Sequence, residues 1–165
     1  MNDSLRKILV ATDGSPDSVL AALRAVELAR AFGSELHLVH VVALSPPYHM
    51  VGARDFEGPS LYEEDTEWAR ELLDEQVGRI EEAGGKVAEA HLRRGEPDAE
   101  LVSLAEEMGA DLIVVGSRGS NPLKRLPIGS VSSSVVTHAH CPVLVARTEE
   151  KETGHEVREQ ERRSR

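Results

Sequence analysis

The chain has 165 residues, a formal net charge of −10, a single cysteine and few aromatic residues (one Trp, two Tyr and two Phe). This length predicts one domain that buries its own core, and the lone Cys141 excludes an internal disulfide. The negative charge and the scarcity of aromatic side chains argue against binding to nucleic acid or to an anionic membrane. Residues 1–7 lack the apolar stretch of a signal peptide, and no apolar run is long enough to span a bilayer, so we expect a cytoplasmic protein.

Short β-branched runs alternate with segments of helical periodicity along the chain. The apolar runs predict strands at residues 7–11, 35–42, 86–93, 112–115 and 142–146. The segments with helical periodicity fall at residues 16–32, 61–83, about 98–108 and 130–137. This order predicts an α/β domain, in which helices cover both faces of a five-stranded parallel sheet.

Capping residues mark several of the predicted helix ends. Ser15 is a suitable N-cap, and Pro16 suits the first helical position. Asp98 is expected to cap the third helix, and Gly33 and Gly109 follow the ends of the first and third.

Two segments differ from the rest of the chain. Residues 45–60 contain several prolines and glycines and form either a lid over a site or an ordinary surface loop. Residues 148–165 are highly charged and almost without apolar side chains, which predicts a disordered or solvated tail. The folded domain is therefore expected over residues 1–147.

The most informative motif is Gly116-Ser117-Arg118-Gly119, followed, after nine intervening residues, by Gly129-Ser130. It lies between an apolar strand and a helix of small residues. Glycines let the backbone approach an anion closely, and a helix start offers unpaired N–H groups with a partial positive charge. The motif therefore predicts a phosphate-binding site. Neither a Gly-x4-Gly-Lys-Ser/Thr nor a Gly-x-Gly-x2-Gly motif is present, which argues against a P-loop enzyme or a dinucleotide dehydrogenase.

Taken together, these motifs closely resemble those of the universal stress proteins over about residues 5–147. The resemblance rests on five stretches of sequence: Ile8 to Ser15, Gly95-Glu96-Pro97, Asp111 to Gly119, Gly129-Ser130-Val131, and Cys141 to Val145. The spacing Gly-x2-Gly-x9-Gly-Ser matches the ATP-binding branch of the family. The resemblance implies an adenine nucleotide alpha hydrolase-like, Rossmann-type fold with strand order 3-2-1-4-5. Asp13 and Gly116 would then be neighbours at the carboxyl ends of adjacent strands, where such sheets bind ligands.

The resemblance also implies roles for individual residues. ATP would bind with a divalent ion, Mg²⁺ or Mn²⁺, and Asp13 would contact the ribose or hold the metal. Adenine would meet the backbone near Ala11, Thr12 and Val41. The other implied contacts are Val115 and Gly116 beside the nucleotide, Arg118 and Gly119 beside the ribose and phosphates, and Gly129, Ser130, Val131 and Ser132 as hydrogen-bond donors to phosphate.

Several of these features have simpler explanations. The glycine loop could be a tight turn without a ligand, and Asp13 could serve only to cap the first helix. Lys124 and Arg125 are either phosphate contacts or solvated loop charges. His40 either lines the site or packs within its strand.

His138, His140 and Cys141 resemble metal ligands, but they have no evident fourth partner. Histidines favoured by the dipole at a helix end are the better explanation, and Cys141 is expected to be a small buried apolar residue.

No nucleophile, base and orienting group can be recognised together, so we expect nucleotide binding with slow or absent ATP hydrolysis. The alternatives are a sensor of AMP or cyclic AMP, a slow ATPase and, more distantly, a flavin-binding relative. The resemblance further implies a homodimer, formed by antiparallel pairing of the edge strand Val143 to Ala146. It implies a regulatory factor in the stress response.

Overall fold

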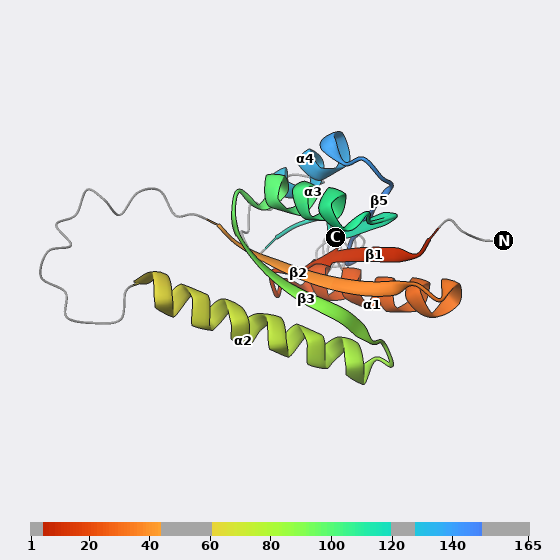
Figure 1. Cartoon of the computed structure of the whole chain (residues 1–165), viewed down its shortest axis with the longest axis horizontal. Coiled ribbons are helices and arrows are strands. Elements are labelled where there is room, and N and C mark those ends of the chain that lie inside the picture. Colours follow the sequence, from red (N-terminus) through yellow and green to blue (C-terminus); the bar gives the residue numbers. More distant parts are fainter. Residues whose placement is uncertain (1–4, 44–60, 120–127, 150–165) are drawn as a thin grey trace, which may run out of the picture.

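A parallel sheet of five strands forms the middle layer of the computed structural model, which describes residues 5–43, 61–119 and 128–149 (Figure 1). The strand order is β3-β2-β1-β4-β5, as predicted. The strands are β1 (Lys7–Ala11), β2 (Glu35–Ala43), β3 (Val87–Gly95), β4 (Leu112–Gly116) and β5 (Val143–Ala146). Several extend one or two residues beyond the predicted ends, and β3 and β5 form the two edges.

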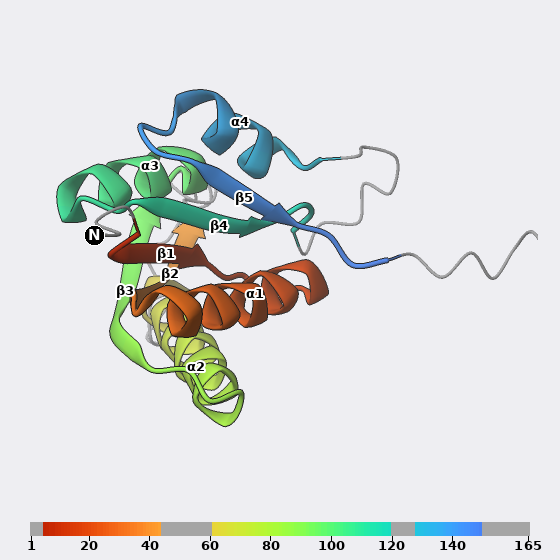
Figure 2. The same cartoon turned by 90° about the vertical axis from the view of Figure 1, so that its right-hand side faces the viewer.

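Helices cover both faces of this sheet. They are α1 (Pro16–Phe32), α2 (Leu61–Glu82), α3 (Pro97–Met108) and α4 (Ser130–His138). Figures 1 and 2 show α1 and α2 on one face of the sheet and α3 and α4 on the other. The α/β architecture and the parallel sheet predicted from the sequence are therefore confirmed.

The two helical layers divide the core into two clusters. Ile8 and Val10 of β1 pack with residues of α1 and α2, whereas Leu9 between them packs with residues of α3 and α4. Successive side chains of a strand point to opposite faces, so a strand covered on both sides needs apolar residues at every position. This explains the unbroken apolar runs in the sequence.

The ends of α1 and α3 follow local capping rules with one exception. Ser15 caps α1 and accepts the N–H of Ser18 at 3.3 Å. The prediction that Asp98 caps α3 is wrong, because the helix begins at Pro97 and Glu96 occupies the N-cap position. Proline fits the first helical turn, where its missing N–H is not needed. Asp98 lies in that turn and accepts a hydrogen bond of 2.5 Å from Ser134 Oγ of α4.

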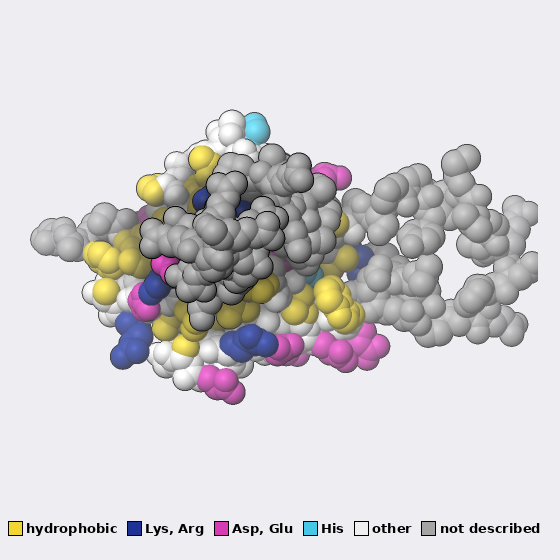
Figure 3. Space-filling view, turned by 180° about the vertical axis from the view of Figure 1, so that it is seen from behind, with side chains coloured by type: hydrophobic (Ala, Val, Ile, Leu, Met, Phe, Trp, Pro, Cys, Tyr) yellow, Lys and Arg dark blue, Asp and Glu magenta, His cyan; other side chains and the backbone are white. Residues whose placement is uncertain are grey.

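Charged side chains of both signs are intermixed along the lower part of the face seen in Figure 3. Exposed ion pairs join neighbouring turns within a helix, such as Arg24–Glu27 (2.9 Å) in α1 and Arg79–Glu75 (2.7 Å) in α2. Such pairs contribute little to stability. None of the described helices combines the length and the apolar character that crossing a bilayer would require.

Three segments considered in the sequence lie wholly or mainly outside the described residues: the 45–60 segment, the loop with Lys124 and Arg125, and the tail from residue 150. Thr148, at the start of the predicted tail, is described. Its backbone N–H donates to Asp17 Oδ1 at 3.0 Å, which ties the chain just after β5 to the first turn of α1.

Candidate functional site

A cavity of about 490 Å³ lies where β1, β2 and β4 end and α4 begins. Every residue that the sequence analysis assigned to nucleotide binding lines it: Ala11, Thr12, Asp13, Val41, Val115, Gly116, Arg118, Gly119, Gly129, Ser130, Val131 and Ser132. Their position fits the rule that open parallel sheets bind ligands at the carboxyl ends of strands, beside the point where strand order reverses. The structure thus brings together residues from four separate parts of the chain.

The backbone after β4 runs very close to its neighbours. A Cβ atom at Gly116 would lie 2.8 Å from the backbone of Asp17, so only glycine fits there without a shift. A Cβ atom at Gly119 would lie 2.9 Å from Asp13 Oδ2. The glycines therefore allow the loop to pass directly beside the Asp13 carboxylate.

Asp13 supports the turn before α1 and also faces the cavity, whereas Ser15 is the N-cap of the helix. Asp13 Oδ1 accepts the N–H of Ser15 at 2.9 Å, next to the start of α1, and the residue also lines the cavity. The hydrogen bond to Ser15 and a position in the site are therefore compatible. In this position, Asp13 could contact a ribose or a divalent ion on phosphates.

Asp17, which sequence reasoning missed, fixes the loop that follows β4. Its Oδ2 accepts hydrogen bonds from Ser117 Oγ at 2.6 Å and from the Arg118 N–H at 3.2 Å. Its Oδ1 accepts the N–H and the hydroxyl of Thr148. Burial acts to raise the pKa of Asp17, but these hydrogen bonds outweigh it and the pKa is lowered.

The N-terminus of α4 opens toward the cavity. Gly129 is the N-cap, no described side chain caps this end, and the first turn contains no acidic residue. The expectation that Gly129 donates to phosphate is not met, because its N–H donates to the Ser117 carbonyl at 2.6 Å. The Ser132 hydroxyl donates to the Gly116 carbonyl at 2.5 Å, which leaves the backbone N–H of Ser132 as its donor toward an anion. This end of α4 has the polarity that a phosphate requires.

The opposite wall of the cavity contains an aromatic pair. His40 is buried, and its Nδ1 lies 2.7 Å from the Thr12 carbonyl oxygen, so Nδ1 is the protonated nitrogen. Its ring meets Trp68 of α2 edge-on, with the ring centroids 6.0 Å apart. His40 thus both packs in its strand and lines the cavity. Nothing in the local sequence of α2 distinguishes Trp68, which is 60% exposed.

Other residues of the cavity wall were also missed by the sequence analysis. They come from α1, β2 and α3 and are Ser18, Val39, Val42, Ala43, Pro97 and Leu101. Whether these residues line the cavity depends on which helices the fold places beside the strand ends, and no local sequence motif encodes that placement.

His138, in the last turn of α4, behaves as a helix-end residue. His138 Nδ1 lies 2.9 Å from the Ser134 carbonyl, within the same helix. Cys141 is half-buried, and burial raises the pKa of its thiol. Among the described side chains, the group that could hold a metal ion together is His37, Glu89 and His91, far from this helix in sequence.

Comparison with known proteins identifies the family. The chain matches the universal stress protein family over residues 4–147, and it therefore belongs to that family. It is similar to universal stress protein MJ0531 of Methanocaldococcus jannaschii, with 37% identity over 147 residues that cover 89% of this chain and 85% of that protein.

Solved structures show the same fold. The hypothetical protein MJ0577, whose structure was used to assign its biochemical function, matches with a TM-score of 0.74 and 29% identity over 90% of this chain and 99% of that one. A universal stress protein in complex with cAMP matches with a TM-score of 0.67 and 29% identity over 89% of this chain and 100% of that one. A relative of this fold therefore binds an adenine nucleotide.

Proposed function

We propose that this universal stress protein binds ATP with a divalent ion, Mg²⁺ or Mn²⁺, in the cavity between β1, β2, β4 and α4. The observation that carries the proposal is the convergence of the glycine loop, Asp13 and the N-terminus of α4 on that one cavity. Its volume, about 490 Å³, lies within the range of small-molecule sites.

The two ends of the cavity suit the two ends of a nucleotide. The apolar wall formed by Val41, His40 and Trp68 suits a flat adenine ring. The N–H groups at the start of α4 suit phosphate, and Asp13 would hold the divalent ion against it. The ion would neutralise phosphate charge, while the chain's own residues bind and orient the nucleotide.

A second candidate is AMP or cyclic AMP. A relative of the same fold was solved in complex with cAMP, and the cavity residues do not fix the number of phosphates. In either case, we infer a cytoplasmic regulator of the stress response that responds to its nucleotide, with slow or absent hydrolysis. The proposed unit is a homodimer joined along β5.

The first test is whether the purified protein carries a nucleotide, read by acid extraction and chromatography. Calorimetry with ATP, AMP and cyclic AMP, each with and without Mg²⁺, then ranks the ligands. We expect ATP with Mg²⁺ to bind most tightly. Tighter binding of AMP or cyclic AMP would favour the second candidate, and the absence of bound nucleotide together with no measurable affinity for any of the three would contradict both.

Trp68 provides an independent readout, because it is the single tryptophan of the chain and it lines the cavity. Nucleotide binding should change its fluorescence with the same affinity that calorimetry gives. Trp68→Phe removes the tryptophan fluorescence. Any change in emission that remains in this variant comes from light absorption by the nucleotide and not from binding.

A further inference from the structure

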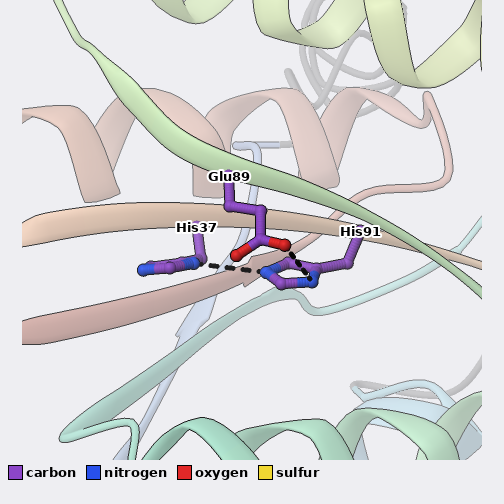
Figure 4. A group of neighbouring side chains, drawn as sticks. All are labelled: His37, Glu89 and His91. Carbon is purple, nitrogen blue, oxygen red and sulfur yellow. Dashed lines mark hydrogen bonds and ion pairs between the residues drawn. The ribbon is translucent and has the colours of Figure 1, made fainter.

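Two histidines and a glutamate meet on β2 and β3, outside the nucleotide cavity (Figure 4). His37 comes from β2, Glu89 and His91 come from β3, and the Glu89 carboxylate points toward the two imidazole rings. One ligand atom from each of the three lies within 4.8 Å of the others. This group lies toward the start of β2, whereas the cavity uses the second half of the same strand.

The strand register builds the group. A register shift between Leu36 and His37 brings Glu89, rather than Ala88, opposite His37. His91 lies two residues beyond Glu89, so both side chains point to the same face of β3. Bulges of this kind re-aim side chains and are frequent at functional sites.

The imidazole nitrogens already have the spacing of metal ligands. His37 Nδ1 and His91 Nε2 lie 3.2 Å apart and share a hydrogen bond, so one of the two nitrogens carries a proton that a bound ion would replace. Two nitrogens bound at zinc's usual distance in a tetrahedral site would be about 3.3 Å apart. The rings are nearly parallel, at 22°, with centroids 5.5 Å apart, and they would turn to direct both lone pairs to a common ion.

A carboxylate outside the ligand group lies beside the second ring nitrogen of His37. His37 Nε2 is buried without a hydrogen-bond partner among the described residues, and a Glu35 oxygen lies 3.5 Å from it. A Glu89 oxygen lies 3.8 Å from His91 Nδ1, but Glu89 is a candidate ligand of the ion and so cannot also orient this ring. Histidine ligands of metals commonly donate their second N–H to a carboxylate, which orients the ring.

The surrounding charges are compatible with a cation. The nearby Arg93 guanidinium is paired with Glu107 at 2.5 Å and lies 3.9 Å from Glu100, so its positive charge is balanced.

We propose that His37 Nδ1, His91 Nε2 and the Glu89 carboxylate bind a divalent transition-metal ion of the Zn²⁺ type, which joins the edge strand β3 to β2. Imidazole and carboxylate ligands suit Zn²⁺, and water completes the tetrahedron because Glu89 is exposed to solvent. The Glu35 carboxylate orients His37 by accepting its Nε2–H.

The test is a calorimetric titration of the full-length, nucleotide-free chain with ZnCl₂. We expect one Zn²⁺ per chain, and an affinity reduced at least about tenfold in His91→Ala, in Glu89→Gln and in His37→Ala. His37 is buried, so circular dichroism must show that His37→Ala folds. His91 and Glu89 are more exposed than His37, so His91→Ala and Glu89→Gln test the proposal even if His37→Ala does not fold.

The matched control is the double variant His138→Ala/His140→Ala, which removes two exposed histidines elsewhere and should leave the affinity unchanged. Asp13→Asn should also leave it unchanged, because Asp13 belongs to the nucleotide cavity. The proposal is overturned if the wild-type chain binds no Zn²⁺, or if the affinity for Zn²⁺ is unchanged in His91→Ala or Glu89→Gln. It is also overturned if that affinity falls in His138→Ala/His140→Ala or in Asp13→Asn.

Discussion

The Ser117 hydroxyl, in the loop after β4, donates a hydrogen bond of 2.6 Å to the Asp17 carboxylate, 100 residues earlier in the first turn of α1. The same carboxylate accepts the N–H groups of Arg118 and Thr148. One buried side chain thus holds the start of α1, the glycine loop and the chain after β5 in a fixed relation. The geometry of the candidate site depends on this connection.

Replacing Asp17 should therefore destabilise the fold. Asp17→Ala removes the acceptor of several hydrogen bonds in a buried setting and leaves their donors unpaired. Hydrogen bonds to a charged group contribute about 1.5–3 kcal/mol, so we expect a loss of about 3 kcal/mol in the free energy of unfolding. Urea denaturation followed by circular dichroism measures it.

The control for this variant is Asp74→Ala, which changes an exposed aspartate on α2 and should alter stability by less than about 0.5 kcal/mol. An Asp17→Ala protein as stable as the wild type would show that this carboxylate does not hold the loop. Nucleotide affinity should fall with Asp17→Ala and not with Asp74→Ala, because the loop that lines the cavity loses its support.

Stability should also fall in acid. The pKa values of Asp17, Asp98 and Asp111 are lowered from 3.8 in the folded chain, mainly by hydrogen bonds that the charged carboxylates accept. A carboxylate with a lowered pKa stabilises the folded state above its unfolded value and loses that contribution as the pH falls through its folded value. The free energy of unfolding should therefore decrease mainly below about pH 4.

Denaturation at a series of pH values between 7 and 3 checks this expectation. The decrease should be smaller for Asp17→Asn, because that variant lacks one of the titrating groups. A wild-type profile that stays flat down to pH 3, or an equal decrease in both proteins, would contradict the assignment of Asp17.

A side chain at Gly119 should weaken nucleotide binding. The β-carbon would lie 2.9 Å from Asp13 Oδ2, so Gly119→Val would displace the carboxylate and occupy part of the cavity. The displaced carboxylate and the lost cavity space should reduce affinity about tenfold, which corresponds to about 1.4 kcal/mol. Calorimetry with ATP and Mg²⁺ measures the change.

Gly78→Ala is the matched control, because Gly78 lies in α2 with no atom near the position of its missing β-carbon. It should leave affinity unchanged and should raise helix stability by about 1 kcal/mol. If Gly119→Val bound ATP as well as the wild type, the nucleotide would not lie beside this loop.

The free edge of β5 is expected to form the dimer. Pro142 and Ala146 carbonyls accept hydrogen bonds from β4, at 3.0 Å from Ile113 N and 2.7 Å from Ser117 N. Backbone groups alternate in direction along a strand, so those of Val143 and Val145 face the open edge. Val143→Lys should shift the mass measured by light scattering toward the monomer, because a charged edge resists pairing.

Val136→Lys is the control, since Val136 is 51% exposed on α4 and lies off this edge. Val145→Pro is a second variant, because an edge strand tolerates the loss of an outward N–H while a dimer would lose a hydrogen bond. An unchanged dimer mass in both edge variants would place the interface elsewhere.

The sequence alone determined the α/β architecture and the place of the candidate site. Apolar runs fully buried in a parallel sheet, the Ser15 cap and the terminal glycines are local features, so they can be read from neighbouring residues. The glycine loop was also identified locally, because strand, glycines and helix start follow one another directly in the chain. The strand order was supplied by the resemblance to a family.

Only the tertiary structure decided which distant residues meet. Asp17 reaches Ser117, Trp68 of α2 reaches His40, and His37 faces Glu89 across a register shift. These contacts depend on the placement of whole elements, and long-range packing sets that placement while leaving no periodic pattern in the sequence. The predicted Asp98 cap is wrong for the same reason. Pro97 already fits the first helical turn, and the Asp98 side chain accepts a hydrogen bond from Ser134 of another helix.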